Sequence, residues 1–169
     1  MAHPLETLIN EADGFLLIGE SAKDRFPAFS YNAYQHAQKR FYCLDLDGLT
    51  ESRGPSKGGK VYTSVAELPE DRDDLAIIWV HPKSASRAVD VAHAAGCKRV
   101  WFSFKTGHPN AVAHARELGM EVVEIGRCPV YYLKDKPTAC VAHTMVVKLA
   151  GGYDKAPQLD PNAKRREMF

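Results

Sequence analysis

Residues 75–80 read Leu-Ala-Ile-Ile-Trp-Val, and residues 100–104 read Val-Trp-Phe-Ser-Phe. Both runs are short and almost continuously apolar, whereas a strand with one face in water alternates apolar and polar residues. Runs of this kind are typical of strands that are buried on both faces of a parallel sheet. These two runs therefore predict the centre of an α/β domain.

Similar runs and helical patterns alternate along the rest of the chain. The predicted strands cover residues 15–18, 41–46, 75–80, 99–104 and 121–124. The predicted helices cover residues 4–12, 30–40, 84–95, 110–118 and 138–150. This alternation indicates an α/β fold: a single three-layer domain with a five-stranded parallel sheet. Right-handed crossovers favour a doubly wound sheet with strand order 3-2-1-4-5.

Two helices and the C-terminus carry further local signals. Ser30 is a candidate N-cap for the second predicted helix. The last helix places Ala142, Met145, Val146 and Leu149 on one face. Residues 153–169 contain few apolar side chains, so we expect a C-terminal tail behind a folded domain of residues 1–152.

Composition excludes several classes of function. The chain has 169 residues and a formal net charge of +1, which argues against electrostatic binding to nucleic acid or anionic lipid. It contains no apolar run long enough to span a membrane and no pattern of a secretory signal. Its four cysteines form no C-x-x-C pair, and its histidines form no H-E-x-x-H motif. We therefore expect a cytoplasmic protein with reduced thiols and no metal site.

The loop after the first strand is the first candidate for ligand binding, because ligands of open α/β sheets bind beyond the carboxyl ends of the strands. Its glycine would allow close approach of a ligand, its serines would donate to phosphate oxygens, and its cations would balance negative charge. These residues are Gly19, Ser21, Lys23, Arg25 and Ser30. The loop has neither G-x-G-x-x-G nor a Walker motif, so a plain polar connection is the alternative.

Later strand ends supply further candidates. Asp47 follows the second strand, where dehydrogenases place an acid that holds a ribose hydroxyl. His81 follows the third strand and would act as an acid or base or, alternatively, have a structural role. Cys128 lies beside Arg127, which would lower the pKa of the thiol and make it reactive; the alternative is a structural cysteine.

Several motifs taken together resemble a known family. They are residues 15–21 (FLLIGES) with the later Arg25 and Ser30, residues 59–69 (GKVYTSVAELP), residues 80–82 (VHP), residues 100–104 (VWFSF) and residues 126–129 (GRCP). Their order is similar to that in the small stand-alone coenzyme A-binding domain proteins. The nucleotide-binding domain of the succinyl-CoA synthetase α subunit shares that fold. The resemblance covers residues 14–150 and implies a Rossmann-like domain that binds coenzyme A.

The resemblance also implies roles for individual residues. Gly19, Ser21, Lys23 and Ser30 would meet the pyrophosphate, and Asp47 would lie near the adenosine ribose. The adenine and pantetheine path would be lined by residues at the next two strand ends: His81, Pro82, Phe104 and Lys105. The histidine domain that performs phosphoryl chemistry in the synthetases is absent here, so the resemblance implies no catalysis.

One departure from the family concerns the end of the second strand. This chain has Asp47-Gly48 where the family commonly has Asn-Pro. A carboxylate at this place would repel the 3′-phosphate of coenzyme A and would suit a free ribose diol, as in NAD. Arg53, Lys57 and Lys60 in the following loop would supply compensating charge.

These observations favour a binding protein for coenzyme A or an acyl-CoA that is non-catalytic or regulatory. One alternative is an NAD(P)-linked or thiol-dependent enzyme that uses the same nucleotide pocket. Another is a structural module that is active only with a partner chain, including a second copy in a homo-oligomer.

Overall fold

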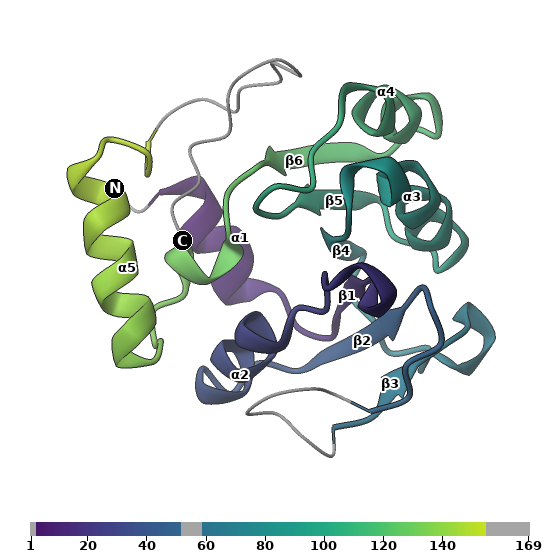
Figure 1. Ribbon diagram of the computed structural model, residues 1–169, viewed down its shortest axis with the longest axis horizontal. Coiled ribbons are helices and arrows are strands. Elements are labelled where there is room, and N and C mark those ends of the chain that lie inside the picture. The colour runs from purple at the N-terminus through teal and green to yellow at the C-terminus, as the bar shows by residue number, and fades with distance from the viewer. Residues whose placement is uncertain (1–2, 52–58, 155–169) are drawn as a thin grey trace.

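A six-stranded parallel sheet forms the middle layer of the computed structural model, which describes residues 3–51 and 59–154 (Figure 1). The strand order is β3-β2-β1-β4-β5-β6. The strands are β1 (Phe15–Gly19), β2 (Phe41–Asp45), β3 (Val61–Tyr62), β4 (Leu75–Trp79), β5 (Arg99–Phe102) and β6 (Glu121–Ile125).

The predicted sheet lacked one strand, β3, and as a result residues 75–80 were expected at the wrong position in the sheet. The expected order placed residues 75–80 beyond residues 41–46, but β4 pairs with β1 instead. The outer position beside β2 belongs to β3, which the sequence analysis missed. A strand of two residues is too short to show either alternation or an apolar run. Once β3 is counted, the doubly wound order 3-2-1-4-5 holds and β6 extends it.

Helices cover both faces of the sheet (Figure 1). One face carries α3 (Ala85–Ala94) and α4 (Pro109–Glu117). The other carries α1 (Pro4–Glu11) and α2 (Ala28–His36), with α5 (Thr138–Leu149) outermost. The described connections contain the short 3₁₀ turns η1 (Ser21–Lys23), η3 (Val65–Glu67), η4 (Pro82–Ser84) and η5 (Pro129–Tyr132).

The core has two parts, one on each side of the sheet, and successive strand residues contribute to them in turn. In β1, Leu16 and Ile18 face the α3–α4 side, while Phe15 and Leu17 face the α1–α2 side. All four side chains are fully buried. This two-sided burial explains why the central strands are almost continuously apolar.

Helix α2 starts two residues earlier than expected. Its N-cap is Pro27 and gives no side-chain hydrogen bond, so Ser30 lies inside the helix and is buried. The predicted cap was wrong because the fixed φ of proline suits the start of a helix, and this signal outweighed that of the serine.

Helix α5 exposes the face that carries its large apolar side chains. Met145 is 60% exposed and Leu149 is 88% exposed, and Val141 and Val146 are also exposed. The helix buries Thr144 and Val147 instead. Its contacts are chiefly with η5 rather than with the sheet, so the helical pattern alone did not determine which face is buried.

The folded part of the chain includes Tyr153, which the sequence analysis placed in the tail. Its side chain is buried, and its carbonyl accepts a hydrogen bond of 2.8 Å from the Tyr132 hydroxyl. Residues 155–169, with most of the predicted tail, lie outside the described residues, as do Arg53 and Lys57.

Candidate functional site

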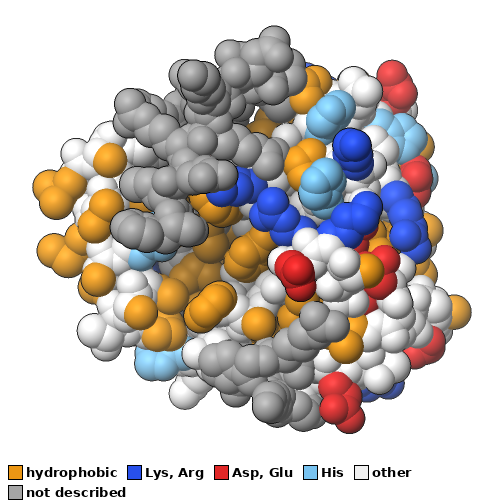
Figure 2. Space-filling model, in the orientation of Figure 1, with side chains coloured by type: hydrophobic (Ala, Val, Ile, Leu, Met, Phe, Trp, Pro, Cys, Tyr) orange, Lys and Arg blue, Asp and Glu red, His pale blue; other side chains and the backbone are white. Residues whose placement is uncertain are grey.

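The carboxyl ends of the strands form the face seen in Figure 2. The chain passes from β1 to α2 on one side of the sheet and from β4 to α3 on the other, so the switch point lies between β1 and β4. Lys and Arg side chains with several histidines gather in a band on this face (Figure 2). Beside the band, on the α2 side of the sheet, the surface is hollowed and lined by hydrophobic side chains.

Gly19 ends β1 and allows a close approach, but to the protein's own chain. A Cβ atom at this position would lie 2.7 Å from Cδ of Pro27. Gly19 therefore permits the start of α2 to pack directly on β1. The sequence analysis expected this glycine to admit a ligand.

The turn after β1 is held by two carboxylates. Asp45 is fully buried and accepts hydrogen bonds from the Ser21 N–H and hydroxyl, both at 2.8 Å, and from the N–H groups of Asp47 and Leu49. Asp47 in turn accepts one from the Ala22 N–H at 2.8 Å. The Ser21 hydroxyl, which was expected to donate to a phosphate, is thus paired within the protein. Asp45 was missed because the number of hydrogen bonds that an acid at a strand end accepts depends on the conformation of the loops around it, which the sequence does not reveal.

Glu20 connects the ends of β1 and β4. Its side chain is buried and accepts hydrogen bonds from the His81 N–H at 3.0 Å and from the Ser84 hydroxyl at 2.5 Å. The Lys23 ammonium lies 3.8 Å from the same carboxylate. Glu20 was also missed by the sequence analysis, and it draws η1 and η4 together across the switch point.

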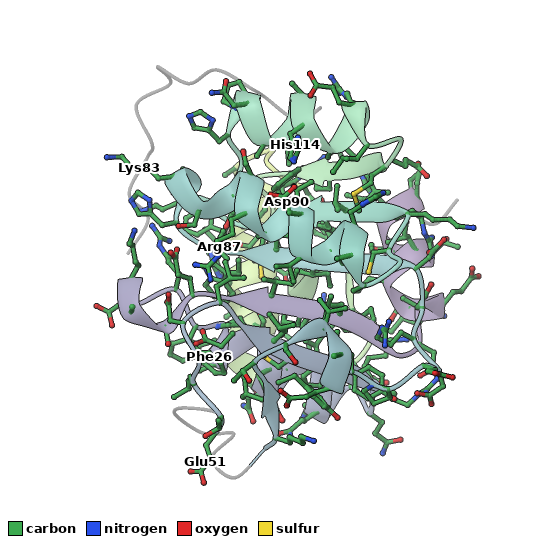
Figure 3. The ribbon with its side chains drawn as sticks, turned by 90° about the vertical axis from the view of Figure 1, so that its right-hand side faces the viewer. Phe26, Glu51, Lys83, Arg87, Asp90 and His114 are labelled. Atoms are coloured by element: carbon green, nitrogen blue, oxygen red, sulfur yellow. The ribbon has the colours of Figure 1, made fainter. Side chains whose placement is uncertain are left out.

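Three cations lie close enough to His81 to act on its charge, and two of them, Lys23 and Arg25, were predicted site residues. Burial lowers the pKa of His81, and the positive charges of Lys23, Arg25 and Lys83 lower it further, while Glu20 opposes them. The imidazole Nδ1 accepts the Lys83 N–H at 3.2 Å and so caps η4, which begins at Pro82. Figure 3 shows Lys83 projecting from this edge. The structure therefore brings η1 and η4 cations together around a histidine with a capping role.

Phe104 and Lys105 form the turn after β5. Lys105 has a φ of 56°, and its ammonium lies 5.3 Å from the centre of the Phe104 ring. The hydroxyl of Thr106 donates to the Val80 carbonyl at 3.1 Å, which ties this turn to the end of β4.

Arg127 and Cys128 do not form the reactive pair that was considered. The Arg127 guanidinium pairs with Glu124 and donates to the Tyr153 carbonyl, so it does not act on the thiol. Burial raises the pKa of Cys128 to about 11, which contradicts the lowered pKa. Its sulfur lies 4.0 Å from Oγ of Ser30, so two predicted residues do meet here, on the α2 side of the sheet.

Residues 3–51 and 59–154 contain no group of three or more His, Cys, Asp or Glu side chains that could hold a metal ion. None of their helices combines the length and the apolar character needed to cross a membrane.

Comparisons with solved structures support the fold. A hypothetical protein from Pyrococcus horikoshii superposes with a TM-score of 0.62 at 24% identity, over 76% of this chain and 86% of that one. A conserved hypothetical protein from Pyrococcus furiosus gives 0.56 at 24% identity, over 70% and 97%. A Thermus thermophilus protein gives 0.58 at 18% identity, over 76% and 92%.

Among curated proteins no match was found. The model of a protein family described as a CoA binding domain matches residues 15–133. These residues include all six strands and leave out α1 and α5. This match agrees with the order of motifs along the chain and with the doubly wound sheet. The chain therefore belongs to the CoA binding domain family.

Proposed function

We propose that this protein binds coenzyme A or an acyl-CoA at the carboxyl edge of its sheet and catalyses no reaction of its own. The observation that carries the proposal is the group of Lys23, Arg25 and Lys83 around His81, at the switch point of a chain in the CoA binding domain family. Cations at this edge suit the phosphates of such a ligand.

Near β1, the start of α2 suits a phosphate-bearing ligand, whereas the backbone donors of η1 do not. Helix α2 begins without a side-chain cap, which suits an anion at its N-terminus. The N–H groups of Ser21 and Ala22 are already paired with Asp45 and Asp47. In the proposed arrangement the pyrophosphate therefore lies toward the η1 cations and the start of α2, and Phe104 and Lys105 lie further along the ligand.

Calorimetry with coenzyme A and 3′-dephospho-CoA tests the proposal. We expect binding of at least one of them, and a Lys23→Ala variant that binds several-fold more weakly because it loses a phosphate contact. Lys98→Ala is the matched control, since Lys98 precedes β5 at the opposite edge of the sheet. If neither ligand binds at millimolar concentration, the proposal is wrong.

Asp47 provides a test of which ligand is preferred. It is exposed, and one of its oxygens holds the Ala22 N–H. A negative charge here disfavours a 3′-phosphate and favours a ribose diol, so we expect dephospho-CoA to bind at least as tightly as coenzyme A. Asp47→Asn should then shift the preference toward coenzyme A. An unchanged ratio of affinities would place the ribose elsewhere.

A further inference from the structure

Two side chains at the carboxyl ends of β4 and β5 carry buried donors that no described residue accepts from. The indole N–H of Trp79 and the hydroxyl of Ser103 are both inaccessible to solvent, and neither has a hydrogen-bond partner among the described residues. Ser103 as a whole is only 1% exposed. An unpaired buried donor lowers the stability of the fold, so two neighbouring ones call for an explanation.

These two side chains lie next to each other on one face of the sheet. Ile78 is in register with Phe102, and the Ser103 N–H continues the ladder by donating to the Ile78 carbonyl at 2.9 Å. Trp79 and Ser103 are therefore opposite neighbours on strands about 4.8 Å apart. Ile77 and Trp101, two residues before each of them, belong to the core on the α1–α2 side. By alternation, both donors face that side.

The surroundings on that face are known from three contacts. Pro27, at the start of α2, lies over Gly19, which is in register with Trp79 on β1. On the other side, the Arg127 carbonyl accepts the indole N–H of Trp101 at 2.8 Å. The two donors thus lie between the first turn of α2 and the chain that follows β6. The hydrophobic hollow in Figure 2 lies on this same side of the sheet.

The chemistry of this place differs from that of the cationic band. The uncharged side chains of Ser30 and Cys128 meet on this same side of the sheet, and the charge of Arg127 is neutralised by Glu124. An indole N–H and a hydroxyl are uncharged donors, and they suit a neutral acceptor, such as an amide carbonyl, rather than a phosphate. Apolar walls with a few fixed donors are the usual lining of a small-molecule site.

We propose that Trp79 and Ser103 form a subsite that binds an amide carbonyl of the pantetheine arm, beyond the phosphates held by the cationic band. The inference rests on the proposed function and adds the residues that would position the non-nucleotide part of the ligand. Both residues donate: Trp79 through its indole N–H and Ser103 through its hydroxyl.

The experiment compares whole and partial ligands. Affinities for coenzyme A, 4′-phosphopantetheine and adenosine 3′,5′-bisphosphate are measured for the full chain and for Ser103→Ala and Trp79→Phe. We expect each variant to lose about 5- to 10-fold in affinity for the two pantetheine-bearing ligands, the loss of one hydrogen bond, and none for the bisphosphate. Ser64→Ala, at the cap of η3, is the matched serine control.

Fluorescence gives an independent measurement, since the chain has two tryptophans. Trp101 is fully buried and paired, so ligand should change the emission of Trp79 and leave Trp79→Phe without response. If the full chain binds coenzyme A but both variants bind every ligand as tightly as it does, or lose affinity for the bisphosphate equally, the subsite is wrong. If the full chain binds no coenzyme A, the proposed function itself fails.

Discussion

Two neighbouring regions at the carboxyl edge of the sheet differ in whether their buried hydrogen-bond donors are paired. At the ends of β1 and β2, buried Asp45 alone collects four donors. At the ends of β4 and β5, the donors of Trp79 and Ser103 are buried without a partner among the described residues. The first arrangement stabilises the fold, and the second costs stability and is explained best by a ligand. Paired polar groups at a sheet edge thus indicate structure, and unpaired ones indicate where to look for binding.

The largest expected effect comes from removing the acceptor of the paired region. Asp45→Ala leaves four donors unsatisfied at a fully buried position, so we expect the free energy of unfolding to fall by roughly 3 kcal/mol or more. Urea denaturation followed by circular dichroism measures this. Asp47→Ala, which removes one acceptor at an exposed position, should cost about 1 kcal/mol or less. Equal losses in the two variants would contradict the central role of Asp45.

Gly19→Ala probes how tightly the paired region is packed. The new methyl group would meet the Pro27 ring at 2.7 Å, and we expect a loss of roughly 1–3 kcal/mol. In a Gly19→Ala/Pro27→Ala double variant the total loss should be smaller than the sum of the two single losses, because the clashing atoms are gone. Strictly additive losses would show that the clash is relieved in another way.

A pair of serine variants tests the comparison most directly. Ser21→Ala removes a hydroxyl that is bonded to Asp45, and we expect a loss of about 1–2 kcal/mol. Ser103→Ala removes a buried hydroxyl that has no partner among residues 3–51 and 59–154, so stability should be unchanged or rise by up to about 1 kcal/mol in the ligand-free protein. Thermal unfolding of both variants, in the absence of ligand, measures the two changes in stability. A loss at Ser103 as large as that at Ser21 would mean that Ser103 is satisfied.

The smallest effect concerns the protonation of His81. Because its pKa in the folded protein lies below the usual 6.5, the stability that its neutral form contributes is complete above about pH 6.5 and is lost as the pH falls through the folded pKa. Lys23→Ala should bring the pKa back toward its usual value, as measured by NMR titration of the imidazole. Lys98→Ala should leave it in place, and a similar shift in both would mean that the cations around His81 do not set its pKa.

The sequence predicted β1, β4 and β5 as strands because each is buried on both faces, and such burial demands an apolar residue at nearly every position. It placed residues 75–80 at the wrong position in the sheet. It missed β3, since two residues carry no pattern. It also misjudged the start of α2, where a proline outweighed a serine. The exposed face of α5 could not be predicted, because burial there depends on contact with η5. That turn has only four residues and carries no periodic pattern.

The candidate site was predictable in its location and less so in its chemistry. Residues that follow parallel strands must meet at one edge, so the proximity of Lys23, Arg25 and His81 followed from topology alone. Side-chain direction is set by packing, and for that reason Arg127 turned toward Glu124 and Ser21 toward Asp45. Trp79 and Ser103 lie within the apolar runs that define the strands, so they were interpreted as core residues and not as possible ligand contacts.

The outer strands of the sheet bear on how this protein avoids aggregation. The edge strand β3 has only two residues, which leaves little backbone for another chain to pair with. At the opposite edge, β6 begins with an exposed Glu121, whose charge disfavours the approach of a further strand. Both edges are thus poor templates for intermolecular β-pairing, and we expect the folded protein to resist growth of its sheet into larger assemblies.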